Sequence, residues 1–318
     1  MPDAKLSDRP RRRVISPAGA ESQRARPSRR GWWGPAVTQG PSLLVLGVVV
    51  LFPLAYSIKL SFQSYSPIIP NHDGQWIGLD NYQRMLHDGD FHHSLIVTGI
   101  FVVAAVTLET VLGVVVGILI DRLRRMRRVA TSALLLPMIL TPLVVGLMFN
   151  FALNAQFGYL TFVLEKLGIA EGGALNGSVG ALVVLILIDV WEWFPFVALM
   201  VVAGLQTIPK EPLEAASIDG ASTLQVYWHV TLPLLRPILG IAVLFRATEA
   251  IREFDKVFVL TGGGPGSATA VNDLYQYRVS FLNWDLSYGA ALGLVTFVAV
   301  LGLSGLMYRS LRKKETSR

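Results

Sequence analysis

Six ionisable side chains lie within residues 246–256, in the second half of a stretch over 234–260 that is otherwise mostly apolar. They are Arg246, Glu249, Arg252, Glu253, Asp255 and Lys256. On a helical wheel, at about 100° per residue, the six occupy one half of the helix and apolar side chains occupy the other. An unpaired charge at the centre of a bilayer is costly. The charged half must therefore face either an ion-pair network or a water-filled route for a polar solute.

Both interpretations of this stretch stay open. Pairs three or four residues apart, such as Arg246 with Glu249 and Arg252 with Asp255, would form a network along the helix itself. Alternatively, Arg246, Glu249 and Arg252 line a solute pathway, and Arg246 is the deepest of them.

A second polar group combines Asp189 and Glu192 with the rings of Trp193 and Phe194. Sugars are bound by planar polar groups and by stacking on aromatic rings, so this mixture suits a saccharide path. The alternative is a set of aromatic side chains at the membrane interface. Asn150 and Asn154, four residues apart, could share a polar face of their helix, or form hydrogen bonds within the helix bundle.

Apolar stretches long enough to cross a bilayer position these residues. The chain has 318 residues, of which 52% are apolar and 16% charged, against about 25% charged in soluble domains. Five stretches exceed the length of about 20 residues that a membrane helix needs. They cover residues 37–62, 94–120, 129–153, 178–205 and 288–308. Each must be helical because lipid offers the backbone no hydrogen-bond partner.

Proline and glycine predict how these helices bend and pack. Pro137 and Pro142 should bend the third span. Gly113 and Gly117 form a pair of small residues that favours close helix contact, and Glu109, one turn earlier, should face the bundle.

The distribution of basic residues decides whether 234–260 is a sixth span. Of 28 Lys and Arg, nine lie in residues 1–36, five in 121–128 and five in 309–318. Basic loops stay in the cytoplasm, and only six spans place all three segments there. We therefore predict a basic, disordered tail over 1–36, a membrane domain over 37–311 and a short cytoplasmic tail over 312–318.

A polar loop over residues 206–233 has the features of a docking element. Pro212 and Glu214 favour a helix start, and Ala215 and Ala216 give that helix a small-residue face. Gly220 should end it, and Ser222 can cap a second short helix that ends before Pro233. The loop also contains Asp219, beside the bend.

This loop resembles the signature of the permease subunits of bacterial ABC importers: Glu-Ala-Ala, three residues, Gly, nine residues, Ile, one residue, Leu-Pro. The matching residues are Glu214, Ala215, Ala216, Gly220, Leu232 and Pro233, with Val230 in place of Ile. Residues 77–82 and the segments 254–255 and 260–265 are similar to elements of the carbohydrate-type permeases.

The resemblance implies an all-α, six-span permease of the bacterial inner membrane that forms half of a pathway for a sugar, oligosaccharide or polyol. It also implies a second permease chain, two ATPase subunits that bind ATP and Mg²⁺ and contact the 206–233 loop, and an external solute-binding protein. We expect no cofactor, metal or nucleic acid on this chain, and no enzymatic activity.

Two other classes are considered. A secondary transporter driven by an ion gradient could use Asp189, Glu192 and Glu249 as proton sites, but it would have no use for the docking loop. An intramembrane hydrolase would need a nucleophile or a metal constellation, and the sequence offers neither. The glycine-rich run over 262–266 lacks the lysine of a phosphate-binding loop.

Overall fold

The computed structural model describes residues 33–68, 70, 73–123, 125–169 and 173–315. It divides into two units, Met1–Pro53 and Leu54–Arg318. Most of the basic tail, residues 1–32, lies outside the described part of the chain, as do residues 316–318. The boundaries at 36 and 311 therefore stay predictions.

The first unit contains helix α1 (Trp33–Leu46), the π-helical turn η1 (Gly47–Leu51) and the first two residues of α2 (Phe52–Ser61). The candidate membrane span Gln39–Ser61 runs through these elements, close to the predicted 37–62. None of its most apolar window is buried within the described chain.

The second unit is helical apart from one antiparallel hairpin, β1 (Gln63–Tyr65) and β2 (Asp73–Trp76), among the described residues. Its helices are α3 (Asp80–His87), α4 (Gly89–Arg122), α5 (Arg127–Ile139), α6 (Pro142–Ala152), α7 (Tyr159–Lys166), α8 (Ser178–Leu205), α9 (Glu211–Ile218), α10 (Thr223–Val226), α11 (Leu232–Ile251), α12 (Asp255–Leu260), α13 (Asn272–Tyr277) and α14 (Leu286–Glu315). Two further π-helical turns are η2 (Tyr227–Thr231) and η3 (Arg278–Leu282).

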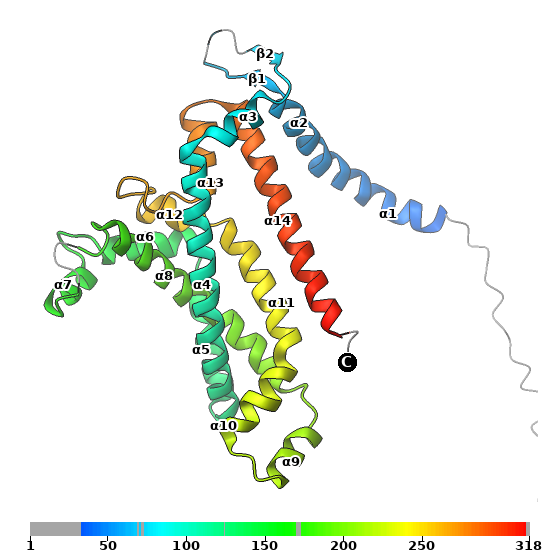
Figure 1. Cartoon of the computed structure of the whole chain (residues 1–318), viewed down its shortest axis with the longest axis vertical. Coiled ribbons are helices and arrows are strands. Elements are labelled where there is room, and N and C mark those ends of the chain that lie inside the picture. The colour runs from blue at the N-terminus through cyan, green and yellow to red at the C-terminus, as the bar shows by residue number, and fades with distance from the viewer. Residues whose placement is uncertain (1–32, 69, 71–72, 124, 170–172, 316–318) are drawn as a thin grey trace, which may run out of the picture. The chain divides into compact units, whose positions relative to one another are not determined.

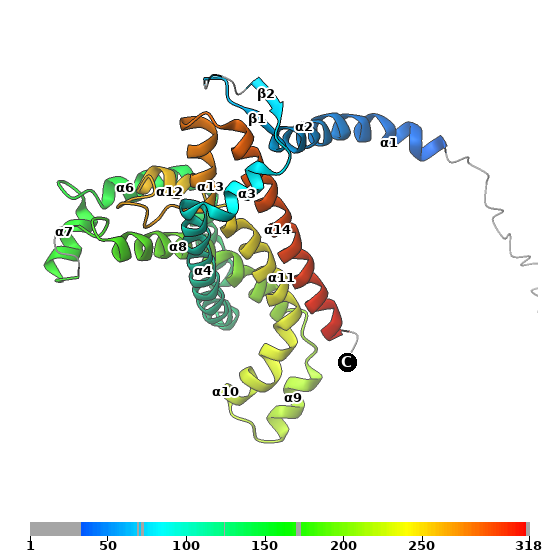
Figure 2. The same cartoon turned by 45° about the horizontal axis from the view of Figure 1, so that its top comes forward.

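The predicted all-α membrane fold is confirmed. Five described helical segments are long and apolar enough to span a bilayer, or six if the bent pair α5 and α6 is one span. Within the second unit, α3 and α13 lie at one end of α4, and α9 and α10 lie near its other end (Figure 1). The turned view keeps this arrangement (Figure 2).

Helices α4 and α8 form the most closely packed pair. A methyl group added at Gly113 would lie 2.5 Å from Cβ of Val197, and one added at Gly117 would lie 2.8 Å from Cβ of Val201. No side chain fits at such distances, so glycine at these two positions permits the contact. The predicted role of the glycine pair is thereby confirmed.

The third predicted span is broken as well as bent. Helices α5 and α6 meet at 86°, and Leu140 and Thr141 between them are extended. A residue that precedes proline is disfavoured in helical conformation, so Thr141 leaves the helix and Pro142 starts a new one. Pro137 stays inside α5.

The predicted bounds of the sixth span, residues 234–260, are wrong at both ends. The candidate span covers Thr223–Ile251, because α10, η2 and α11 follow one another without interruption. Helix α11 ends at Ile251, and α12 begins at Asp255 in a different direction (Figure 1). A continuous helix would have carried four more charges along the span, whereas the break directs Lys256 inward and leaves Arg252 and Asp255 exposed.

Candidate functional site

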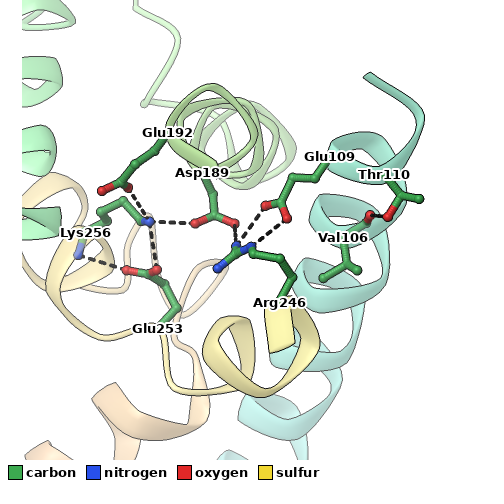
Figure 3. A network of polar contacts seen from close by, with 8 residues as sticks. All are labelled: Val106, Glu109, Thr110, Asp189, Glu192, Arg246, Glu253 and Lys256. Atoms are coloured by element: carbon green, nitrogen blue, oxygen red, sulfur yellow. Dashed lines mark hydrogen bonds and ion pairs between the residues drawn. The ribbon is translucent and has the colours of Figure 1, made fainter. Parts of the chain in front are cut away.

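Charged side chains from four segments meet in the interior of the helix bundle (Figure 3). Helix α4 contributes Glu109, and α11 contributes Arg246. Helix α8 contributes Asp189 and Glu192, whose spacing of three residues places both on one face. Glu253 and Lys256 come from the break after α11 and from α12. We call these six residues the charge network.

Arg246 joins α11 to both α4 and α8. Its Nε donates to Oε2 of Glu109 at 2.7 Å, and its Nη2 donates to Oε1 of Glu109 at 2.8 Å. Nη2 also donates to Oδ2 of Asp189 at 2.9 Å. The guanidinium carbon lies 4.5 Å from the ring centroid of Trp193. A two-pronged pair of this kind fixes the geometry as well as the charge.

Lys256 also contacts carboxylates from more than one segment of the chain. Its Nζ lies 2.6 Å from Oδ1 of Asp189, 2.8 Å from Oε2 of Glu192 and 2.9 Å from Oε2 of Glu253. These three carboxylates match the three protons that an ammonium group can donate. Asp189 therefore bridges the two cations, with one oxygen on each.

The charge network is almost completely buried. Arg246 is 1% exposed, and Lys256, Glu109 and Asp189 are 0% exposed. Removing one member of a buried pair leaves its partner as an unpaired charge, which costs about 3–5 kcal/mol. The network therefore holds α4, α8, α11 and α12 in a defined arrangement.

The partners of Arg246 and Lys256 differ from those expected along one helix. Asp189, Glu192 and Arg246 are brought together, but from separate helices. Glu249 on α11 and Arg252 directly after it are exposed and lie outside the charge network. Trp193 lies against Arg246, and Phe194 is half-buried on the core. Whether any of these residues lines a solute pathway stays a prediction.

Asn150 and Asn154 do not share a helical face. Asn150 Nδ2 donates to the carbonyl oxygens of Val259 and Leu260, both at 3.1 Å, at the end of α12. Asn154 lies beyond the end of α6 and accepts from the backbone N–H of Gln156 at 2.9 Å. The expected shared polar face is therefore wrong, because the helix ends at Ala152, whereas the alternative, hydrogen bonding within the helix bundle, is confirmed for Asn150.

The candidate pathway residues from the sequence did not include Lys256, Glu253 or Glu109, although Lys256 and Glu253 were placed on the charged half of 234–260 and Glu109 was expected to face the bundle. One signal could have found Lys256: two carboxylates spaced three residues apart in an apolar helix require a buried cation, and few basic residues lie in the spans. Which of Arg246, Arg252 and Lys256 supplies it depends on the break after Ile251, which the hydropathy pattern does not reveal.

The predicted docking loop forms an elbow between α9 and α10. Gly220 has a φ of +77°, its N–H donates to the carbonyl of Ser217 at 3.2 Å, and the N–H of Ala221 donates to the carbonyl of Ala216 at 3.0 Å. This pair of bonds is the Schellman ending of a helix, in which glycine suits the left-handed position. The predicted helix end at Gly220 is confirmed.

The second helix of the elbow also begins as predicted. Ser222 and Gln225 form reciprocal side-chain to backbone hydrogen bonds, which is a capping box. The predicted end before Pro233 was wrong, because the chain continues through η2 into α11. The wide π-helical turn lies directly before Leu232 and Pro233, where the proline ring would crowd a regular helix.

The elbow presents an apolar surface to its surroundings. Ile218 is 86% exposed, Leu224 67% and Trp228 64%. Glu214, Ala215 and Asp219 are exposed on α9 and at its end. A groove of about 400 Å³ lies inside the elbow, lined by Ala216, Asp219, Gly220, Ala221, Gln225, Val226, His229 and Val230.

Comparison with known proteins places this architecture in a family. Residues 109–315 match the family described as binding-protein-dependent transport system inner membrane component. A probable ABC transporter permease protein of Sinorhizobium fredii is 37% identical over 87% of this chain and 88% of its own length. The trehalose/maltose transport system permease protein of Thermococcus litoralis is 34% identical over 83% of this chain and 88% of its own length.

A solved structure supports the fold. A chain of the bacterial alginate ABC transporter, in complex with an alginate pentasaccharide-bound periplasmic protein, superposes with a TM-score of 0.75 at 17% identity, over 88% of this chain and 94% of that one. The chain belongs to the inner membrane components of binding-protein-dependent transport systems, and it is a permease subunit of an ABC importer rather than an enzyme.

Proposed function

We propose that this subunit forms one half of the pathway of an ATP-driven importer for a carbohydrate or related polyol. A second permease chain supplies the other half, two ATPase subunits bind ATP and Mg²⁺, and an external binding protein delivers the solute. Both termini and the α9–α10 elbow lie in the bacterial cytoplasm, in agreement with the basic loops. Residues 37–311 form the permease domain.

The observation that carries this proposal is the exposed elbow. Three large apolar side chains, Ile218, Leu224 and Trp228, are exposed on a segment that Gly220 fixes in one shape. Exposed apolar patches of this kind mark protein contacts. An ATPase subunit that binds the elbow can move α11 directly, because α10, η2 and α11 are continuous.

The pathway runs along an exposed stripe of α11 rather than through the charge network. Phe245 and Glu249 are four residues apart on α11, which places them on one face, and Arg252 directly follows the helix; all three are exposed. The ring of Phe196 lies 5.0 Å from that of Phe245. Such a mixture of rings and charges suits a saccharide better than lipid, since lipid cannot solvate Glu249.

The solute class is supported by the relatives as well. The Thermococcus litoralis relative is named for trehalose and maltose, and the alginate transporter carries an acidic polysaccharide. In this chain every carboxylate of the charge network pairs with Arg246 or Lys256, so we assign the network to bracing the helices and assign the exposed stripe to solute contact.

Substitution of Trp228 tests the role of the elbow. The whole transporter is assembled with its own ATPase, second permease and binding protein, and labelled trehalose and maltose serve as probes. Trp228→Ser should reduce recovery of the ATPase with the permease and reduce ATP-dependent uptake, whereas Trp228→Phe, which keeps an apolar ring, should retain both. Equal recovery and uptake in the two variants would contradict the docking role.

A further inference from the structure

Four aromatic rings form a continuous group at the α12 and α13 segments. The ring centroids of Phe254 and Phe258 are 5.2 Å apart, and those of Phe254 and Tyr277 are also 5.2 Å apart. Tyr277 lies 5.5 Å from Phe258 and 5.6 Å from Phe281. We call these four rings the aromatic track. They come from two segments of the chain, residues 254–258 and 277–281, so the contact between the two pairs is a product of the fold.

One side of the aromatic track is anchored and the other is open. Phe254 and Tyr277 are half-buried and pack against the hydrophobic core. Phe258 is 44% exposed and Phe281 is 58% exposed. A single exposed ring is ordinary on a protein surface, but contiguous rings with free faces provide a surface on which a flat apolar face can stack.

Charged side chains border the aromatic track. Arg252 and Asp255 are exposed on either side of Phe254 in the chain. Asp273, one turn before Tyr277, is close enough to Arg252 to interact with it electrostatically. A surface that faces lipid would not carry these charges. A ligand for this surface therefore has apolar faces and many hydroxyl groups.

We propose that the aromatic track is a stacking subsite for the pyranose rings of the solute, between the α13 end of the subunit and the exposed stripe of α11. This rests on the proposed saccharide transport. The C–H faces of a sugar stack on Phe258 and Phe281, while its hydroxyls bond to Arg252 and Asp255. Successive rings at 5–6 Å offer repeated weak contacts, so the sugar can move from one to the next.

The reactivity of thiols introduced into the aromatic track tests whether the track faces water, lipid or another subunit. The chain contains no cysteine, so Phe258→Cys and Phe281→Cys each give this subunit a single thiol, whose modification is followed on this subunit within the full transporter in proteoliposomes. A charged, membrane-impermeant methanethiosulfonate should modify both thiols. Trehalose or maltose supplied with the binding protein should slow the modification. Reaction only with a lipid-soluble maleimide would show a lipid-facing surface, and crosslinking to the second permease would show a subunit interface; either result overturns the proposal.

Uptake kinetics test stacking itself. Phe258→Leu and Phe281→Leu keep apolar volume but remove the ring, and should raise the KM for ATP-dependent uptake by about two- to tenfold. Phe281→Trp should restore the wild-type value. Phe151→Leu, at an exposed ring on α6 outside the track, serves as the control and should leave KM unchanged.

The outcomes separate this inference from the proposed function. If the wild-type transporter shows no ATP-dependent uptake of either sugar and neither sugar protects the thiols of the two Cys variants, both proposals fail for these solutes. If wild-type uptake is normal and the Leu variants match the control, the stacking subsite is wrong while the proposed function stands.

Discussion

Arg246 on α11 donates two parallel hydrogen bonds to Glu109 on α4, at 2.7 and 2.8 Å, across 137 positions of the sequence. The same guanidinium also contacts Asp189 on α8. One side chain thus connects three helices, and its 1% exposure leaves little surface for a solute.

Loss of this cation should impair folding more than it selectively impairs transport. Arg246→Met leaves Glu109 buried without its partner, at a cost of about 3–5 kcal/mol. We expect a low yield and a reduced Tm in detergent. Adding Glu109→Gln removes the unpaired buried charge and should partly restore both the yield and the Tm. Normal Tm and yield with abolished uptake would instead place Arg246 in the solute pathway.

The contact between α4 and α8 offers a matched pair of glycines. Gly113→Ala places a methyl group 2.5 Å from Cβ of Val197, while Gly99→Ala on the same helix meets no atom within 4 Å. Overpacking of this kind costs about 1–3 kcal/mol. Thermal unfolding should therefore show a lower Tm for Gly113→Ala and an unchanged or higher Tm for Gly99→Ala. A similar Tm for both would mean that the two helices can separate without loss.

The bend at Gly220 should depend on backbone conformation rather than on side-chain size. With a φ of +77° and no atom within 4 Å of an added Cβ, the position accepts volume but disfavours β-branched residues. Asparagine tolerates this conformation better than most residues. Gly220→Val should uncouple ATP hydrolysis from uptake, and Gly220→Asn should retain coupling. Equal coupling ratios in the two variants would refute the need for this bend.

The hydrogen bonds of Asp88, at the start of α4, predict that the stability of the protein depends on pH. Burial alone would raise its pKa, but hydrogen bonds from Tyr275, Tyr288 and two backbone N–H groups outweigh burial and lower the pKa below its usual 3.8. A lowered folded-state pKa stabilises the protein above the unfolded-state value, and this stabilisation is lost as the pH falls through the folded-state pKa.

Asp88→Asn isolates the charge, because asparagine can still cap the helix. The Tm of the wild type should exceed that of the variant at about pH 6, and the difference should shrink as the pH falls below 3.8 and through the lower folded-state pKa. A constant difference between the two across this range would assign the effect to something other than ionisation of Asp88.

The apolar spans and the docking elbow could be predicted because both depend on local sequence. Residues 178–205 form α8 with the predicted bounds, and the φ of Gly220 follows from the ending of one short helix. The pairing of Arg246 with Glu109 could not be predicted, since spacing along one helix favours Glu249 equally well. The break after Ile251, which directs Lys256 to Asp189, cannot be located from the hydropathy of the sequence, because charged residues lie on both sides of it.

The most direct test of the account compares energy sources for uptake. Proteoliposomes that contain the full transporter should accumulate labelled trehalose or maltose only with ATP inside and the binding protein outside, whether or not a proton gradient is present. Uptake by this chain alone, driven by a proton gradient without ATP, would contradict the account.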